Sequence, residues 1–253
     1  NNLGEAYRNR IRGDKAQNIE LAIGYFTAAL SVYTREAFPQ DWAMTQNNLA
    51  NAYCDRIRGE KADNIEMAIG YFTAALTVYT RKAFPEKWAQ TQNNLANAYS
   101  NRIRGEKAQN IEVAIASYTA ALTVYIRDNF PENWATTQNN LANAYSNRIR
   151  GEKAQNIEVA IASYTAALTV YIRDNFPENW AMTQNNLATA YSNRIRGEKA
   201  QNIEMAIASY TAALTVYTRE AFPQKWAGTQ NNLATAYSNR IRGEKAQNIE
   251  MAI

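Results

Sequence analysis

The sequence repeats itself every 46 residues, and this periodicity constrains the fold more than any other feature. The tryptophans recur at this interval, at Trp42, Trp88, Trp134, Trp180 and Trp226, and so do the prolines, at Pro39, Pro85, Pro131, Pro177 and Pro223. A fixed period of this length is typical of one supersecondary unit stacked on copies of itself. The 253 residues are therefore predicted to form one solenoid array rather than one or two globules.

The array is predicted to hold five full repeats and part of a sixth. The repeats span 1–46, 47–92, 93–138, 139–184 and 185–230, and the partial repeat spans 231–253. The chain has no initiator Met and begins inside a repeat, so we expect a piece of a longer protein. It has neither a run of about 18 apolar residues nor a basic-then-apolar leader, so we expect no membrane-spanning helix and no signal peptide. The single cysteine, Cys54, forms no internal disulfide and favours a reducing, cytoplasmic location.

Residues 131–150 predict the first of two helices in each repeat. Pro131 suits the first helical position, where its missing N–H is not needed. Apolar side chains follow at helical spacing from Trp134 to Ile149. Gly151 is expected to end this helix, because glycine readily adopts the left-handed conformation that closes one.

The second helix is predicted to begin at Asn156, whose side chain suits an N-cap. Its apolar residues recur three and four positions apart from Ile157 to Ile172. It is expected to end before Pro177, because the residue ahead of a proline avoids helical geometry. Two such helices cannot bury their apolar faces alone, but stacked pairs can. The sequence therefore predicts an all-α, right-handed α-solenoid of stacked antiparallel helix pairs.

The pattern of small and apolar residues in the helix pair resembles the tetratricopeptide repeat. In the third repeat the matching residues are Leu95, Ala96, Tyr99, Ala114, Tyr118 and Ala121. The whole chain is similar to long tetratricopeptide variants headed T-x-N-N-L-A, as in kinesin light chains and in bacterial, often cyanobacterial, arrays joined to caspase-like CHAT peptidase domains. The usual repeat has about 34 residues, so the first helix and the turn after it are expected to be longer here.

The resemblance implies that the first helices line a concave groove, which would hold an extended peptide or a protein partner. On a helical wheel, the polar face of the first helix is dominated by amides rather than by charges. An amide both donates and accepts hydrogen bonds, which suits an extended peptide backbone. The candidate groove residues are Met44, Asn47, Asn48, Asn51, Gln90, Asn93, Asn94, Asn97, Thr136, Asn139, Asn140, Asn143, Met182, Asn185, Asn186, Asn231 and Asn232.

Alternatives stay open for several of these positions. The first or the second Asn of each N-N-L triplet is expected to face the ligand, and either row could instead bond neighbouring helices. The most varied position lies two residues after tryptophan, at Met44, Gln90, Thr136, Met182 and Gly228. This variation fits either tuning of the ligand or drift at an exposed site. Tyr25 and Tyr71 replace a serine of later repeats, which fits either partner contact or core packing.

The net charge of +4 raises phosphate or nucleic-acid binding as a further alternative. Two arginines per repeat, such as Arg102 and Arg104, are expected to form a row along one edge. Glu106 and Lys107 lie beside them in the sequence, so we expect local charge pairing rather than phosphate binding. Neither nucleic acid nor a membrane is an expected partner.

An enzyme is not expected from this sequence. It contains no histidine, and Cys54 has no neighbouring base to activate it. No Cys or His cluster suits a metal, and no glycine-rich phosphate loop is present. Carboxylate pairs recur along the array, whereas an active site needs one enclosed pocket. We therefore expect no catalysis, no cofactor and no metal site.

Two non-catalytic functions fit such an array. In the first, it is an interaction scaffold whose groove holds a peptide or protein partner. In the second, it assembles with itself end to end, because the sequence begins within a first helix and stops at Ile253 within a second one. Light scattering across concentration would separate the two, because a filament would lengthen while a capped scaffold would stay monomeric.

Overall fold

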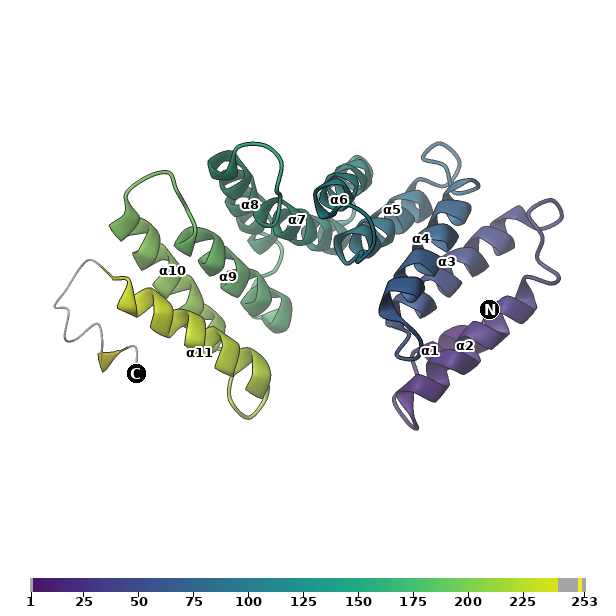
Figure 1. Ribbon diagram of the computed structural model, residues 1–253, viewed down its shortest axis with the longest axis horizontal. Helices are drawn as coiled ribbons and strands as arrows, with labels where there is room; N and C mark the ends of the chain where they lie inside the picture. The colour runs from purple at the N-terminus through teal and green to yellow at the C-terminus, as the bar shows by residue number, and fades with distance from the viewer. Residues whose placement is uncertain (1, 241–249, 252–253) are drawn as a thin grey trace. The chain divides into compact units, whose positions relative to one another are not determined.

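The computed structural model describes residues 2–240 and 250–251, and all regular secondary structure in them is helical (Figure 1). The helices are α1 (Asn2–Arg8), α2 (Lys15–Ala29), α3 (Pro39–Asp55), α4 (Lys61–Leu76), α5 (Pro85–Ser100), α6 (Lys107–Leu122), α7 (Pro131–Ser146), α8 (Lys153–Leu168), α9 (Pro177–Ser192), α10 (Lys199–Leu214) and α11 (Pro223–Ser238). Helix pairs recur with the 46-residue period. The predicted α-solenoid architecture is confirmed.

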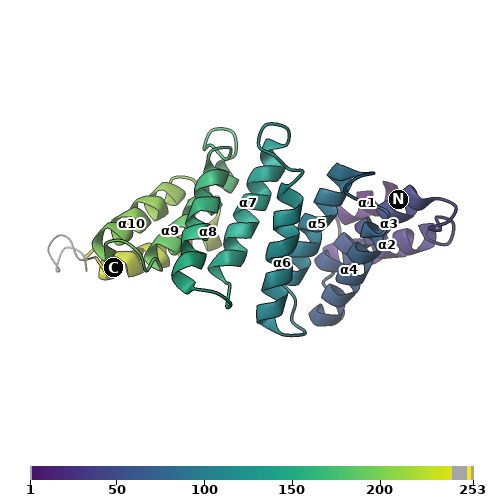
Figure 2. The ribbon, with the colours of Figure 1, turned by 90° about the horizontal axis from the view of Figure 1, so that it is seen from above.

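The chain divides into two compact units, Asn1–Tyr125 and Ile126–Ile253. The first unit stacks α1 to α6 and the second stacks α7 to α11, and within each unit every helix packs against the next one along the chain (Figure 2). One continuous array over the whole chain stays a prediction. The second helix predicted for the partial sixth repeat lies outside the described residues, apart from Glu250 and Met251.

The first helix of the repeat begins where predicted and ends earlier. α7 starts at Pro131, which occupies the first helical position. It ends at Ser146, so the predicted end at Gly151 is wrong. Ile149 therefore does not continue the buried face and is 59% exposed in the following loop. Gly151 has a φ of +78° inside this loop, a conformation that strains any residue with a side chain.

The second helix starts earlier than predicted, and Asn156 is not its N-cap. α8 begins at Lys153, after Glu152, whose side chain makes no capping hydrogen bond. Asn156 lies within the helix and is buried, and its Nδ2 donates to the carbonyl oxygen of Arg150 at 2.9 Å. Its Oδ1 accepts a hydrogen bond from Arg148 at 3.4 Å. Asn156 thus links α8 to the preceding loop, because its side-chain amide bonds both Arg148 and Arg150 of that loop.

Buried alanines and aromatic rings form the core between helix pairs. In the cluster shared by α3, α4 and α5, Phe72 and Ala68 are fully buried. α8 ends at Leu168, so Tyr171 lies in the link to the next repeat rather than on the helix as predicted. Tyr171 is still buried, because its ring packs against Phe176 with 5.7 Å between ring centroids. Each large side chain buried in this way contributes about 1.5–3 kcal/mol before chain entropy is subtracted.

Candidate functional site

The first asparagine of the N-N-L triplet links neighbouring first helices. Asn47 Oδ1 accepts a hydrogen bond of 3.2 Å from the Thr91 hydroxyl of the next first helix, α5. The same bond recurs from Thr183 to Asn139 at 3.3 Å and from Thr229 to Asn185 at 3.1 Å. These threonines are buried, so the bond is shielded from water. The side-chain oxygen of this row is therefore used in a bond between consecutive first helices.

The second asparagine of the triplet also reaches a neighbouring repeat. Asn94 Nδ2 donates to Asn51 Oδ1 of the preceding repeat at 3.3 Å. Asn186 makes the same bond to Asn143 at 3.3 Å. In the first repeat the acceptor position holds Glu5, which accepts from Asn48 at 2.8 Å. This row therefore bridges consecutive first helices, as the first row does.

The residue two positions after leucine forms a third polar row, and it bonds the second helix of its own repeat. Tyr164 donates its phenolic hydrogen to Asn143 Oδ1 at 2.6 Å, and Tyr118 does the same to Asn97 at 2.5 Å. The first two repeats hold Phe26 and Phe72 at the tyrosine position and lack this bond. The third row thus differs chemically between the first two repeats and the later ones.

The predicted groove residues differ in exposure. Three of them are buried, namely Asn47, Asn48 and Asn139. Four are exposed, namely Gln90, Thr136, Met182 and Asn231. The others are partly exposed, namely Met44, Asn51, Asn93, Asn94, Asn97, Asn140, Asn143, Asn185, Asn186 and Asn232.

At two sets of positions, the sequence left open whether the side chains contact a partner. Side chains at both sets contact other residues of this chain. At the most varied position, Met44 packs against the core cluster around Tyr79, and the Thr136 hydroxyl lies 2.5 Å from the Tyr171 hydroxyl. Tyr71 packs against the core cluster of α3 to α5, with its ring centroid 5.5 Å from that of Tyr53. Core packing therefore accounts for Tyr71.

Two equivalent pockets lie between consecutive repeats on this face. One has a volume of about 190 Å³ and is lined by Cys54, Lys61, Ile65, Asn97, Ala98 and Asn101. The other has a volume of about 360 Å³ and is lined by Thr189, Ser192, Asn193, Lys199, Ile203, Tyr210, Asn232, Thr235, Ala236 and Asn239. Six lining positions of the smaller pocket recur three repeats later in the larger one. The sequence analysis had placed Asn97 on the ligand face, and Asn97 does line a pocket.

Each pocket contains a lysine from the start of a second helix. Lys61 is the first residue of α4, and Lys199 is the first residue of α10. Neither lysine forms an ion pair with another described residue. The ammonium groups are therefore available to a partner, and the neighbouring amides add neutral donors and acceptors.

Cys54 lines the smaller pocket and is exposed. Burial of its sulfur against the pocket wall, and then the charge of Asp55, raise the pKa of the Cys54 thiol to about 11. A thiol with this pKa is protonated at neutral pH. A protonated thiol is a poor nucleophile, in agreement with the inert role that the sequence suggested.

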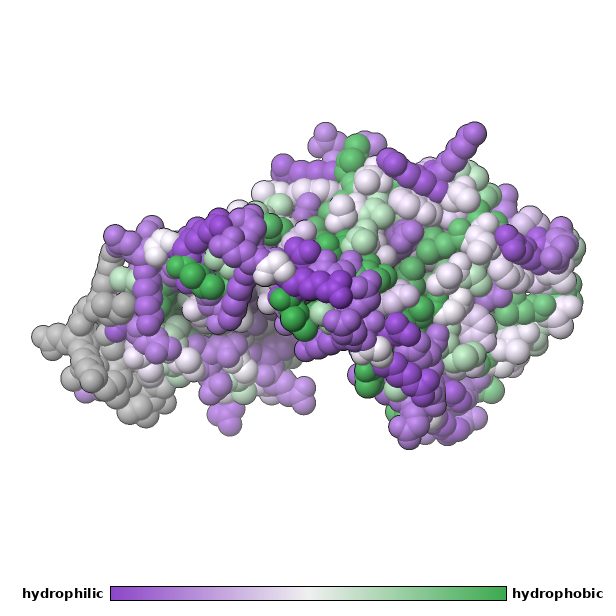
Figure 3. Space-filling view, turned by 45° about the horizontal axis from the view of Figure 1, so that its top comes forward, coloured by the Kyte–Doolittle hydropathy of each residue, from purple (hydrophilic) through white to green (hydrophobic). Residues whose placement is uncertain are grey.

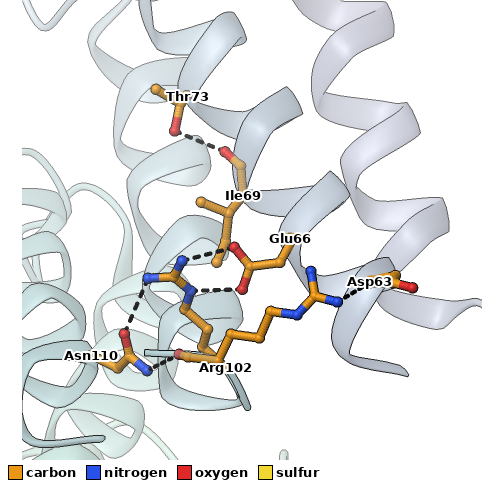
Figure 4. A network of polar contacts seen from close by, with 7 residues as sticks. Asp63, Glu66, Ile69, Thr73, Arg102 and Asn110 are labelled. Carbon is orange, nitrogen blue, oxygen red and sulfur yellow. Dashed lines mark hydrogen bonds and ion pairs between the residues drawn. The ribbon is translucent and has the colours of Figure 1, made fainter. Parts of the chain in front are cut away.

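The arginines after each first helix bind acids of the preceding repeat. Figure 4 shows Arg102 held by Glu66 through two hydrogen bonds of 2.8 Å and bonded to Asn110 at 3.3 Å. Arg104 pairs with Asp63. The predicted local pairing with Glu106 and Lys107 is therefore wrong for these two side chains. The same two-bond pairing joins Arg56 to Glu20, Arg194 to Glu158 and Arg240 to Glu204.

Comparison with known proteins agrees with the repeated helix pairs. Residues 134–169, which cover most of α7 and all of α8, match the family model described as "Tetratricopeptide repeat". Residues 134–169 form a tetratricopeptide repeat. The crystal structure of BtubC (BKLC) from P. vanneervenii shares the fold with a TM-score of 0.65 and 20% sequence identity, over 92% of this chain and 86% of that chain. No curated protein matches the sequence.

Tetratricopeptide repeats generally mediate protein–protein interactions and form a non-catalytic scaffold fold. Within residues 2–240 and 250–251, no group of three or more potential metal ligands comes together. In the same part of the chain, no helix is long and apolar enough to cross a membrane.

The stack of helix pairs is expected to lose stability in acid. The hydrogen bonds from Arg102 and Arg194 lower the pKa values of Glu66 and Glu158 below the ordinary 4.5. A lowered folded-state pKa gives stability that is present above the unfolded pKa and is lost as pH falls through the folded pKa. The urea midpoint should therefore fall as the pH is lowered from about 5 to about 3. The Glu66→Gln/Glu158→Gln variant should show a shallower fall, and an equal slope in both proteins would contradict the assignment.

Two functional features escaped the sequence analysis. The buried threonine of T-Q-N-N-L, such as Thr91, was not given a role, although it is identical in all five copies. Its position four residues before leucine places it beside the core and could have indicated an inter-repeat bond. The acid that binds Arg102 was also missed, because Glu66 lies 36 residues earlier and only stacking brings the two together.

Proposed function

We propose that this tetratricopeptide array is a non-catalytic scaffold that binds an extended peptide or a protein partner along its amide-rich face. The equivalent pockets between consecutive repeats support this most directly, because they offer the same contact again at a later repeat. Each compact unit contains one of these pockets, so each unit can contact a segment of a partner. This geometry suits an extended segment better than a compact small molecule.

The hydrogen bonds of the third polar row support the same proposal. Asn143 Oδ1 accepts from both Tyr164 and Asn186, at 2.6 and 3.3 Å. Two donors on one oxygen fix the orientation of the amide, so its Nδ2 donors face away from both. Asn143 is partly exposed. Its N–H groups are therefore oriented in advance for a peptide carbonyl, which lowers the entropic cost of binding.

The proposal is tested by blocking both pockets with the same side chain. Peptides of random sequence are displayed on phage and selected on the wild-type chain, and the affinity of a selected peptide is measured by fluorescence anisotropy. The Asn101→Arg/Asn239→Arg variant places a long side chain at the wall of each pocket. Its dissociation constant should rise about tenfold or more, which corresponds to about 1.4 kcal/mol.

The matched control carries the same substitution away from the pockets. Met67 and Met205 occupy equivalent positions on α4 and α10, are each 42% exposed and line neither pocket. The Met67→Arg/Met205→Arg variant adds the same charge and should bind within about twofold of wild type. Equal losses in both variants, or unchanged affinity in the pocket variant, would refute the proposed site.

A further inference from the structure

At the junction between α9 and α11, the second asparagine of the triplet makes no bond to the preceding first helix. Between α7 and α9, Asn186 Nδ2 donates to Asn143 Oδ1 at 3.3 Å. Between α9 and α11 the corresponding residues are Asn232 and Thr189. The side chain of Asn232 forms no hydrogen bond with another described residue, and it is partly exposed. This junction therefore presents an amide whose donors and acceptor are unused.

The threonine at position 189 explains why the bond is missing. Thr189 stands where α3, α5 and α7 have an asparagine. Its hydroxyl donates to the carbonyl oxygen of Asn185 at 3.1 Å and lies 3.0 Å from the Tyr210 hydroxyl. Because a hydroxyl has one hydrogen, Tyr210 is the donor in the second contact. The threonine oxygen is also one bond closer to the backbone than an asparagine Oδ1, so it reaches less far toward the next first helix.

The pocket beside Asn232 is longer than its equivalent in the first unit. On α11 the wall of the larger pocket runs from Asn232 to Asn239, about 10 Å along the helix. On α5 the wall of the smaller pocket runs from Asn97 to Asn101, about 6 Å along the helix. The volumes differ accordingly, at about 360 and 190 Å³.

The bond between asparagines ends the smaller pocket. Asn94 donates to Asn51 at 3.3 Å, so these two side chains bridge α5 and α3. Neither of them lines the smaller pocket, whose wall on α5 begins one turn later, at Asn97. Their equivalents in the second unit, Asn232 and Thr189, both line the larger pocket. The missing bridge therefore extends the larger pocket by about one helical turn.

A partner side chain can bury an apolar stem in this extended pocket. Ile203 and Ala236, which are both buried, line it between its two ends. The surface outside offers less, because on the face drawn in Figure 3 apolar residues form separate green patches among hydrophilic side chains. Lys199 lies toward one end of the pocket and Asn232 toward the other, and no carboxylate lines it. The pocket thus fits a long side chain that has an apolar stem and a polar end.

Glutamine matches the polar groups of the pocket better than other long side chains do. Its carboxamide can donate to the amide of Asn232 and accept from it at the same time. A carboxylate can only accept, and lysine or arginine can only donate and would meet the charge of Lys199. Tyrosine offers one hydroxyl in place of two groups, and leucine or methionine would leave the amide of Asn232 without a partner.

Building on the proposed function, we propose that the larger pocket selects a glutamine of the partner and that Thr189 determines this specificity. The threonine acts by leaving the bridge unmade. The pocket then has the length for the glutamine stem, and the amide of Asn232 pairs with the glutamine carboxamide. Asparagine at the same position would close the pocket and occupy that amide, as Asn51 does with Asn94 in the first unit.

Peptide selection tests the residue preference. The Asn101→Arg variant blocks the smaller pocket, so random peptides displayed on phage and selected on this variant report on the larger one. The selected peptides should share a glutamine at one position. Replacing this glutamine by alanine should raise the dissociation constant about tenfold, and glutamate or tyrosine should not restore the affinity. Tight binders without a common glutamine would overturn the proposal.

Substitutions at position 189 test the bridge. Thr189→Asn introduces the residue of the earlier first helices and should weaken the glutamine peptide about tenfold, while the alanine version of the peptide binds both proteins equally. Thr189→Val is the matched control, because valine has nearly the shape of threonine and cannot accept a bond from Asn232. It should bind the glutamine peptide within about twofold of wild type. Equal losses in both variants, or no loss in Thr189→Asn, would refute the role of Thr189.

Failure of this specificity is distinguishable from failure of the proposed function. If Asn239→Arg abolishes peptide binding but Thr189→Asn keeps the glutamine preference, the scaffold function stands and the glutamine specificity is wrong. The small probe N-acetylglutamine amide tests the pocket without any partner. Its addition should shift the NMR signals of the Asn232 side-chain amide in wild type but not in Thr189→Asn. Equal responses in the two proteins would refute the specificity, whichever peptides bind.

Discussion

Replacing Phe72 by alanine is expected to lower the free energy of unfolding by about 3–5 kcal/mol. Phe72 is fully buried and belongs to the cluster that joins α3, α4 and α5, so the cavity would open between two repeats. In a stack, each repeat contacts only its neighbours. The loss therefore weakens the interface through which neighbouring repeats stabilise each other. Urea denaturation followed by circular dichroism would measure it.

The chain provides its own control for this prediction. Tyr118 and Tyr164 occupy the Phe72 position in later repeats, and each bonds an asparagine that corresponds to Asn51. Phe72→Tyr should therefore change stability by less than about 1 kcal/mol, because the new hydroxyl meets an amide. An alanine variant no less stable than Met67→Ala, at an exposed site, would contradict the assignment of Phe72 to the core.

Replacing Arg102 by methionine is expected to lower the free energy of unfolding by about 1–3 kcal/mol. The change removes two hydrogen bonds to Glu66 and one to Asn110, and it leaves a partly buried carboxylate without its partner. Arg102→Lys should not restore stability, because an ammonium cannot make the two parallel bonds of a guanidinium. Thermal unfolding of the three proteins would compare them.

The double variant separates the ion pair from the packing around it. Arg102→Met/Glu66→Met removes both charges, so no carboxylate is left unpaired. It should be more stable than Arg102→Met alone, and the loss of the double variant minus the losses of Arg102→Met and Glu66→Met gives the coupling energy between the two side chains. If the double variant loses as much stability as Arg102→Met and Glu66→Met lose in total, the pair does not couple the repeats.

The helix pairs were predictable because their signals are local. Pro131 and Pro177 begin helices where the sequence placed them, since a proline suits the first helical position wherever it occurs. Alanines such as Ala160 and Ala167 are fully buried, as their helical spacing indicated. Because of the periodicity, the helix pair predicted for one repeat also applied to the other full repeats.

The helix ends were not predictable, because non-local contacts decide them. Ile149 continues the apolar spacing by sequence, but the chain leaves the helix after Ser146. In the equivalent loop, Arg102 reaches across to Glu66 of the preceding repeat, 36 residues away. Asn156 has the residue type of an N-cap, yet its amide binds the loop. Local helix propensity contains no information about these contacts, because they form only when the repeats stack.

The sequence indicated which residue types lie on the polar face of the first helices, but it did not indicate which of them bond neighbouring helices. The amides lie on the first helices, and Asn97 lines a pocket. Asn47 and Asn139, however, are buried and accept hydrogen bonds from threonines of the next first helix. A helical wheel shows which way a residue faces on one helix, but the neighbouring helix determines whether its polar atoms are already bonded.

The Arg–Glu and Thr–Asn bonds across the repeat junctions have a consequence for how such chains evolve. The residues that make them are the same in successive copies, so the junction left by deleting one whole copy would contain the same bonding partners as the junctions it replaces. Unequal recombination in phase with the period would therefore lengthen or shorten the protein without creating a mismatched seam. Insertions out of phase would strand arginines and threonines away from their acceptors, so selection should favour gains and losses of entire units.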